Sequence, residues 1–181
     1  MNRVLIVVDA QEDFVRGALR NEEAIKALPI LHNVVEYADK NKVFIYYTMD
    51  SHYDDYEDTQ EGKRLPVKHC LKYTDGWDIC EEAMNETSHG IVCKETFGFL
   101  GWESKINIRE ADEIWLCGFC TDICVSANFQ ILKASAPEAR IVVIENACAG
   151  VTPELHKAAL MVMKSCQADV MTFDELKKEN K

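Results

Sequence analysis

Short apolar runs alternate with amphipathic stretches from one end of this chain to the other, and this alternation limits the folds that it can adopt. The runs lie at 4–8, 43–48, 90–94, 113–119, 140–145 and 168–173. They consist mainly of apolar residues, as strands do when both faces of their sheet are buried. Strands of this kind belong to parallel sheets that are covered by helices on both sides.

The stretches between the runs carry helical patterns. Apolar residues at 4-3-4-3 spacing predict a first helix, with one face formed by Ala24, Leu28, Leu31, Val35 and Ala38. A second helix is predicted over 123–134, and a third begins at Thr152-Pro153, because proline suits the first helical turn. The apolar positions of this third helix are Leu155, Ala159, Val162 and Cys166.

These patterns predict one α/β domain over residues 1–181. We expect a three-layer, Rossmann-like, doubly wound and mostly parallel sheet of about six strands, with helices on both faces. Apolar residues make up 48% of the chain, which is enough to build a core. Residues 50–77 are the exception to the alternation. They are polar and acidic with little periodicity, and a long irregular segment in a compact domain is usually functional or mobile.

Charge and cysteine usage exclude several classes of protein. The formal net charge of −11 argues against nucleic-acid and membrane-surface partners, because phosphate groups would be repelled. The first apolar run is short and ends in acid, so we interpret it as a strand rather than a signal peptide. No run reaches the length of a membrane span. Several of the eight cysteines lie in apolar runs, which indicates free thiols and a cytoplasmic, reducing location.

Chemically reactive side chains follow four of the predicted strands. Asp9 follows the first strand, Asp50 and His52 follow the second, Lys94 ends the third, and Cys124 comes shortly after the fourth. Ligands bind beyond the carboxyl ends of the strands in an open parallel sheet. The sequence therefore predicts a site at this edge of the sheet, built from these five residues.

Cys124 is the candidate nucleophile. Thr121 or Asp122 could cap the helix that starts here, and a thiol in the first turn of a helix has its pKa lowered. Lys94 would stabilise the thiolate and Asp9 would orient or deprotonate the thiol. Each residue also has a structural interpretation: a buried helix cysteine, a strand-end lysine and a turn-capping carboxylate.

A metal site is the second candidate feature. Asp50, His52 and His69 combine carboxylate and imidazole, which suit Zn²⁺, Mn²⁺ or Fe²⁺. A further oxygen ligand could come from the acidic residues between the two histidines, which are Glu57, Asp58 and Glu61. A thiolate site at Cys117, Cys120 and Cys124 ranks lower, because no second cysteine pair has zinc-ribbon spacing.

Several ordered motifs carry a resemblance to a known family. They are VVDAQEDF at 7–14, TMDSH at 48–52, LPVKHC at 65–70, TDGW at 74–77, Lys94, GFCTDICV at 118–125 and ENACAGVTPELHKAAL at 145–160. Together they resemble the isochorismatase-like cysteine hydrolases, and within them the nicotinamidases. The resemblance extends over almost the whole chain.

The resemblance implies a catalytic triad of Asp9, Lys94 and Cys124. It also implies a cis peptide bond before Cys120, with the backbone N–H groups of Cys120 and Cys124 forming an oxyanion hole. The implied reaction is the hydrolysis of nicotinamide to nicotinate and ammonia through a thioester on Cys124, a step of NAD salvage. A homo-oligomer is the assembly that the family leads us to expect.

The same resemblance assigns one divalent metal ion, Zn²⁺ first, to Asp50, His52, Glu61 and His69. Phe14 and Leu65 are the expected substrate contacts. The chain departs from the usual nicotinamidase pattern in two places. No histidine lies between His52 and His69, so we select Glu61 there, with Glu57 or Asp58 as alternatives. Leu65 replaces an aromatic residue that many nicotinamidases place against the substrate ring.

Two alternatives stay open at this point. The first is a hydrolase of the same fold that acts on another small amide, such as an N-carbamoyl compound, and metal dependence would distinguish it from a nicotinamidase. The second is not an enzyme: Cys120 and Cys124 would serve a thiol redox or metal-binding module. This second alternative leaves Asp9, Lys94 and the metal candidates without a role.

Overall fold

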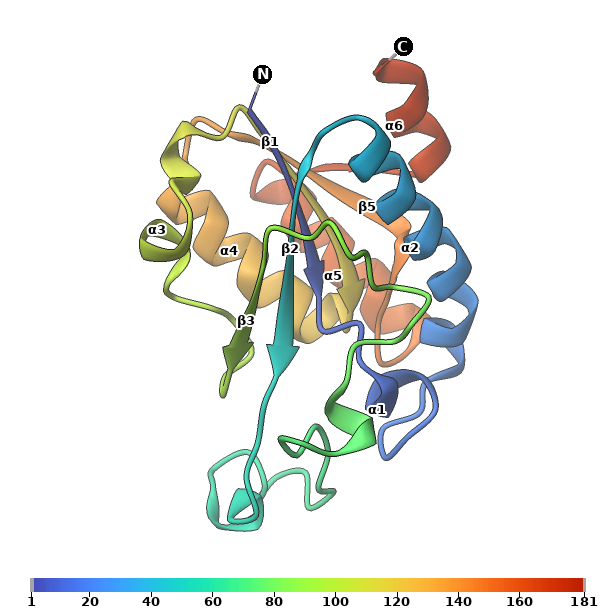
Figure 1. Cartoon of the computed structure of the whole chain (residues 1–181), viewed down its shortest axis with the longest axis vertical. Coiled ribbons are helices and arrows are strands. Elements are labelled where there is room, and N and C mark those ends of the chain that lie inside the picture. Colours follow the sequence, from blue (N-terminus) through green and yellow to red (C-terminus); the bar gives the residue numbers. More distant parts are fainter. Residues whose placement is uncertain (1, 181) are drawn as a thin grey trace.

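The computed structural model describes residues 2–180, and its centre is a six-stranded sheet (Figure 1). The strands are β1 (Arg3–Val8), β2 (Phe44–Asp50), β3 (Gly90–Lys94), β4 (Glu113–Phe119), β5 (Arg140–Ala149) and β6 (Asp169–Met171). Their order across the sheet is β3-β2-β1-β4-β5-β6, and every neighbouring pair is parallel. The predicted fold class is confirmed.

Helices cover both faces of the sheet. They are α1 (Glu12–Val15), α2 (Glu22–Lys40), α3 (Trp102–Lys105), α4 (Ser126–Ser135), α5 (Pro153–Ser165) and α6 (Phe173–Glu179). Helix α2 lies on one side of the sheet, and α4 and α5 lie side by side on the other (Figure 1). Single turns of 3₁₀ helix occur at Tyr56–Asp58, Asp75–Trp77 and Ile108–Glu110. None of the helices formed by residues 2–180 is long and apolar enough to cross a membrane.

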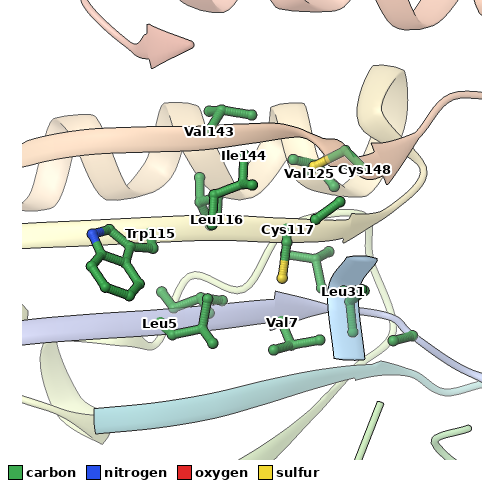
Figure 2. Packing of buried hydrophobic residues seen from close by; sticks show 14 of the residues in the cluster. Leu5, Val7, Leu31, Trp115, Leu116, Cys117, Val125, Val143, Ile144 and Cys148 are labelled. Carbon is green, nitrogen blue, oxygen red and sulfur yellow. The ribbon is translucent and has the colours of Figure 1, made fainter. Parts of the chain in front are cut away.

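The core lies between the central strands and the helices. Leu5 and Val7 of β1 and Leu31 of α2 are fully buried on one face of the sheet, and Leu116 of β4 is fully buried on the opposite face (Figure 2). On the same face as Leu5, Tyr37 of α2 stacks on Trp115 of β4 with ring centroids 6.1 Å apart. Because β1 and β4 are buried along their whole lengths apart from Arg3, both could be recognised from their uninterrupted apolar runs.

Two helical predictions need correction. The third predicted helix is present as α5, with Thr152 as its N-cap, but Leu155 and Val162 are exposed. Ala159 is buried as predicted, and the other buried residues are Leu160 and Met163. The pattern was misassigned because α5 has apolar residues on most of its circumference. Helix α6 was not predicted at all, although Thr172 and Glu175 form a capping box at its start.

The strand order fixes where a ligand can bind. From β1 the chain proceeds to β2 on one side, while β4 and β5 lie on the other side. The order therefore reverses between β1 and β4, which is the topological switch point of the sheet. Loops that leave β1 and β4 separate there and open a crevice. Asp9 follows β1 directly, and the turn that contains Cys124 follows β4.

Candidate active site

A cavity of about 880 Å³ lies beyond the carboxyl ends of the strands. This volume is in the range of small-molecule sites. The wall includes both predicted substrate contacts, Phe14 and Leu65, and part of it comes from the irregular segment 50–77. The predicted site residues in the wall are Phe14, Asp50, His52, Glu61, Leu65, His69, Cys120 and Cys124. Asp9 and Lys94 are buried at its inner end, where they contact residues of the wall.

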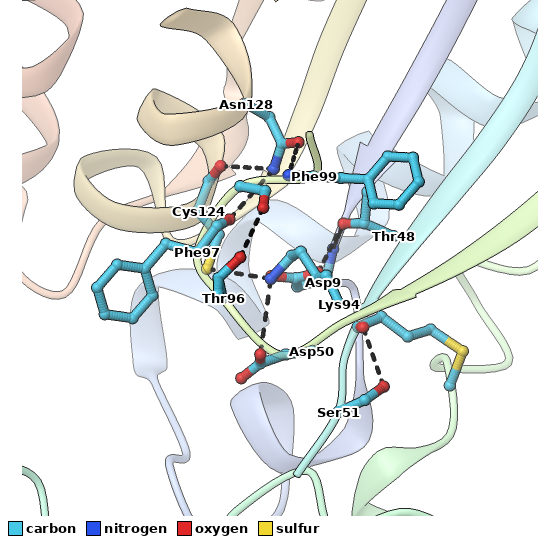
Figure 3. A network of polar contacts seen from close by, with 12 residues as sticks. Asp9, Thr48, Asp50, Ser51, Lys94, Thr96, Phe97, Phe99, Cys124 and Asn128 are labelled. Atoms are coloured by element: carbon cyan, nitrogen blue, oxygen red, sulfur yellow. Dashed lines mark hydrogen bonds and ion pairs between the residues drawn. The ribbon is translucent and has the colours of Figure 1, made fainter. Parts of the chain in front are cut away.

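Lys94 lies between the other two residues of the predicted triad, Asp9 and Cys124, and contacts both (Figure 3). Its ammonium Nζ lies 2.6 Å from Asp9 Oδ2 and 3.6 Å from Cys124 Sγ. A second carboxylate, Asp50, lies 3.6 Å from the same nitrogen. Burial alone would lower the pKa of Lys94, but the charges of its neighbours outweigh burial and raise that pKa. The lysine therefore stays positively charged, as a group that stabilises a thiolate must.

Asp9 is held in one orientation at the end of β1. Its backbone has a φ of +47°, and its side chain is fully buried. Thr48 Oγ1 donates a 2.6 Å hydrogen bond to Asp9 Oδ1, so Oδ2 is the oxygen that faces Lys94. Burial raises the pKa of Asp9, and the nearby ammonium of Lys94 offsets only part of this rise. A raised pKa makes the carboxylate a better proton acceptor.

The structure corrects the expected environment of Cys124. The residue lies in a π-helical turn, Thr121–Val125, which precedes α4. Burial, followed by the charge of Asp9, raises the pKa of the Cys124 thiol well above its ordinary value, although Lys94 acts in the opposite direction. The expectation of a lowered pKa was wrong, because the effect of a helix start is smaller than the cost of burying an anion beside a carboxylate. The resting thiol is protonated and needs a base.

Neither of the proposed caps performs that role. Thr121 Oγ1 lies 2.8 Å from His156 Nδ1 of α5, and Asp122 Oδ1 accepts a hydrogen bond from the backbone N–H of Val151. The N-cap position of the π-helical turn is Cys120, whose side chain makes no capping bond. Thr121 and Asp122 thus connect the turn to the segment that leads into α5.

The peptide bond between Phe119 and Cys120 is cis, as the family resemblance implied. Cys120 lines the cavity beside Cys124, and burial raises the pKa of its thiol to about 12. Its side chain is therefore a poor nucleophile at neutral pH. The part of Cys120 that remains a candidate for chemistry is its backbone N–H group.

Asp50, His52, Glu61 and His69 come together in one cluster, with one potential ligand atom of each residue within 4.8 Å of the others. Four nitrogen–oxygen distances within it run from 3.0 to 3.8 Å. Ligands at about 2.1 Å from a tetrahedral metal ion are about 3.4 Å apart, so this donor set fits such an ion. Among residues 2–180 no thiol belongs to the cluster, and Glu61, not Glu57 or Asp58, is its second carboxylate.

Protonation within the cluster also suits a cation. The Val67 carbonyl lies 2.8 Å from His69 Nδ1, and this contact orients the ring so that Nε2 faces Asp50 and Glu61. Burial would raise the pKa of Asp50, but the hydrogen bonds from His52 and His69 lower it. Glu61 has a raised pKa because it is partly buried and close to Asp50. A bound cation would relieve this concentration of negative charge.

Several residues of the site did not stand out in the sequence. Gln11 is buried and fixes Asp50 from both sides: its Oε1 accepts from the Asp50 N–H at 2.7 Å, and its Nε2 donates to the Asp50 carbonyl at 2.9 Å. The ring of Tyr56 packs against both imidazoles, and its centroid lies 4.6 Å from that of His52 and 5.1 Å from that of His69. Gln11 had a signal, since it comes shortly after Asp9 at the end of the first strand, whereas Tyr56 lies in the segment without periodicity.

Comparison with known proteins identifies the family of the chain. The family profile described as "Isochorismatase domain" matches residues 3–175. A probable inactive nicotinamidase of Arabidopsis thaliana is 25% identical, over 98% of this chain and 96% of its own length. The crystal structure of nicotinamidase/pyrazinamidase PncA from Bacillus subtilis is 27% identical and has a TM-score of 0.84, over 94% of this chain and all of that one.

A third relative concerns the metal cluster. The crystal structure of pyrazinamidase of Pyrococcus horikoshii in complex with zinc is 25% identical, with a TM-score of 0.82 over 96% of this chain and all of that one. The family profile covers nearly the whole chain. The chain therefore belongs to the isochorismatase family of hydrolases.

Proposed function

We propose that this chain is a metal-dependent cysteine amidohydrolase, and that nicotinamide is its first candidate substrate. The reaction is nicotinamide plus water to nicotinate plus ammonia, which would contribute to NAD salvage. One observation carries the proposal: the Lys94 ammonium lies between Asp9 and Cys124, and the carboxylate–imidazole cluster shares the same cavity. The Arabidopsis relative is named as a probable inactive nicotinamidase, and activity is proposed for this chain because Lys94 contacts both Asp9 and Cys124.

The mechanism begins with a proton transfer. Asp9 Oδ2 takes the proton of the Cys124 thiol, and Lys94 stabilises the thiolate that results. The thiolate forms a bond to the amide carbon, and the N–H groups of Cys120 and Cys124 hold the oxyanion. Removing one donor of this kind typically costs about 10²–10³ in rate.

The second half of the mechanism returns the enzyme to its resting state. Asp9 gives its proton to the amide nitrogen as the C–N bond breaks, so that ammonia leaves and a thioester remains on Cys124. Asp9 then takes a proton from water, which attacks the thioester carbon. The acid leaves, and the thiol recovers its proton. The raised pKa values of Asp9 and Cys124 support a proton shared between these two groups.

The metal proposal rests on the donor set. Asp50, His52, Glu61 and His69 would hold one divalent cation, with Zn²⁺ first and Mn²⁺ or Fe²⁺ as alternatives. When bound there, the ion supplies a Lewis acid that can bind the ring nitrogen of a pyridine carboxamide beside the thiol. Phe14 would pack against the ring, since it lines the cavity and its own ring centroid lies 6.2 Å from that of His69.

The substrate can be tested directly. Ammonia release by the purified chain would be measured with nicotinamide, pyrazinamide and N-carbamoyl amino acids, before and after chelation and Zn²⁺ reloading. We expect zinc-dependent release from nicotinamide, and no release by Cys124→Ala. If no ammonia were released from nicotinamide with metal supplied, but ammonia were released from an N-carbamoyl compound, the second candidate, a hydrolase of another small amide, would be favoured. N-carbamoyl amino acids belong in the test because the cavity is larger than a pyridine carboxamide needs.

The thiol redox module is the alternative from another class. It requires a reactive Cys120, but burial raises the pKa of this thiol to about 12. Titration of thiols with and without oxidant would decide, since a reversible Cys120–Cys124 disulfide coupled to partner binding would favour this alternative. A homo-oligomer and a cytoplasmic location remain proposals, and sedimentation analysis tests the first of them.

A further inference from the structure

Asn128 makes the most extensive set of side-chain hydrogen bonds near the candidate nucleophile (Figure 3). It belongs to α4, one helical turn after Cys124, and is fully buried. Its Nδ2 donates to the carbonyl of Cys124 at 2.9 Å and to that of Phe97 at 3.3 Å. Its Oδ1 accepts from the backbone N–H of Phe99 at 3.1 Å and from Trp102 Nε1 at 3.2 Å.

These four bonds use both donors and both acceptor positions of one amide group. Two of the partners, Phe97 and Phe99, belong to segment 95–99, which directly follows Lys94 at the end of β3. Glu95, Thr96 and Phe97 of this segment line the cavity. The segment has no regular secondary structure, so its own backbone does not fix its position.

Hydrogen bonds between segment 95–99 and the rest of the described chain all end on the Asn128 amide. The only other hydrogen bond of the segment is internal, from Thr96 Oγ1 to the Gly98 carbonyl. The same amide holds the carbonyl of Cys124. One side chain therefore connects the cavity wall after Lys94 with the turn that carries Cys124.

We propose that Asn128 is a positioning residue that fixes two parts of the active site at once. Through the Cys124 carbonyl it holds the nucleophile turn at its distance from Lys94. Through Phe97 and Phe99 it holds segment 95–99 as a wall of the substrate cavity. The inference rests on the proposed function only where a substrate is used to measure it.

The geometry suggests a way to separate these two effects. A threonine on a helix can donate from Oγ1 to the carbonyl four residues earlier, which here is that of Cys124. Its hydroxyl is too short to replace the amide at Phe97 and Phe99. Asn128→Thr therefore keeps the contact with Cys124 and loses the contact with the wall, whereas Asn128→Ala loses both. Gln130→Ala is a matched control, because Gln130 is exposed on the same helix.

Two of the three readouts need no substrate. Alkylation of Cys124 by iodoacetamide at one pH, followed by mass spectrometry, reports whether the thiolate is still stabilised by Lys94. Hydrogen exchange of residues 95–99 reports the order of the wall. The third readout is the change in KM and in kcat for nicotinamide, in variants whose melting temperature shows that they are folded.

In Asn128→Ala we expect Cys124 to be alkylated about tenfold more slowly, as the loss of one hydrogen bond at the Cys124 carbonyl predicts. Residues 95–99 should exchange at least about tenfold faster, because this segment loses two hydrogen bonds. In Asn128→Thr the rate of Cys124 alkylation should stay within about twofold of the native rate, and residues 95–99 should exchange as fast as in Asn128→Ala. The KM for nicotinamide should rise about tenfold, with a smaller change in kcat. Gln130→Ala should match the native chain throughout.

Other outcomes would overturn the inference. If Asn128→Thr and Asn128→Ala changed the rate of Cys124 alkylation equally, Asn128 would have a general structural role. Its hydrogen bond to the Cys124 carbonyl would then have no separate effect on the nucleophile. Unchanged exchange at 95–99 in both variants would exclude the wall contact. If Asn128→Ala did not fold, the threonine variant alone would decide through the same two readouts. If the native chain released no ammonia from nicotinamide, the proposed function would fail, while alkylation and exchange would still test Asn128.

Discussion

Thr48 Oγ1 donates a 2.6 Å hydrogen bond to Asp9 Oδ1, and both side chains are fully buried. The hydroxyl also lies 3.2 Å from the backbone N–H of Asp9, so it fixes the carboxylate relative to its own backbone. This bond favours the ionised form of Asp9 at a place where burial favours the neutral form. The pH dependence of the enzyme should therefore be sensitive to a residue that takes no proton itself.

Removal of this hydroxyl should shift the pH profile. In Thr48→Val the pKa of Asp9 rises further, because the bond that lowers it is lost. Asp9 must be ionised to accept the thiol proton, so activity is lost as pH falls through its pKa. The acid limb of kcat/KM should move to higher pH by on the order of one unit, since a hydrogen bond to a charge is worth about 1.5–3 kcal/mol.

The control for this prediction is Thr48→Ser, which keeps the hydroxyl. Its acid limb should stay where the native limb is. At a pH well above the pKa of Asp9 in both the native chain and Thr48→Val, Asp9 is ionised in every variant. The values of kcat/KM should therefore converge there. An unshifted limb in Thr48→Val would mean that a group other than Asp9 controls this part of the profile.

The ion pair between Lys94 and Asp9 should be essential for stability as well as for catalysis. Lys94→Met leaves the carboxylates of Asp9 and Asp50 buried without their common cation, and breaking a buried pair typically costs about 3–5 kcal/mol. The free energy of unfolding, measured in urea, should fall by that order. The double variant Asp9→Asn/Lys94→Met should recover part of the loss without recovering activity. Fully additive destabilisation would contradict the pairing.

The residues of the proposed triad could be selected from the sequence because the carboxyl ends of parallel strands lie at one edge of the sheet. Asp9 and Lys94 stand at the ends of apolar runs, so their place at the same edge of the sheet followed from the prediction that the strands are parallel. Thr48 could not be predicted in this way. It lies inside an apolar run, and only the register of β2 against β1 places its hydroxyl beside Asp9. Asn128 had no signal either, because its partners Phe97 and Phe99 lie about thirty residues earlier in the chain.

Two other features depend on quantities that a sequence does not contain. The direction of the pKa shift of Cys124 follows from burial beside Asp9, which outweighs the effect of a helix start. The selection of Glu61 from three acidic residues depends on the path of segment 50–77, which has no periodic spacing. The same lack of periodicity left Tyr56 unnoticed, although its ring packs against both histidines of the cluster.

Glu61 should contribute to metal affinity and Glu57 should not. Glu61 belongs to the cluster, whereas Glu57 lies 3.5 Å from Lys68 at the surface. Glu61→Gln removes a charged oxygen, so zinc affinity should fall by at least the 10–100-fold that the loss of outer partners costs. Competition with a chromophoric chelator measures this affinity without any substrate. The matched control, Glu57→Gln, should bind zinc like the native chain. Equal affinities for both variants would remove Glu61 from the ligand set.

Gly118, just before the cis peptide bond, should tolerate no side chain. Its φ is +118°, and a Cβ atom there would lie 2.0 Å from the carbonyl oxygen of Val8 on β1. Backbone cannot give way as a side chain can, so Gly118→Ala should separate β4 from β1 near Asp9 and lower stability by more than about 4 kcal/mol. In Gly90→Ala the nearest atom is a ring carbon of Tyr46 at 3.4 Å, so the melting temperature should barely change. If the two variants had comparable melting temperatures, β1 and β4 could separate at Gly118 without a cost in stability. That result would contradict the close contact between these strands, on which the position of Cys124 depends.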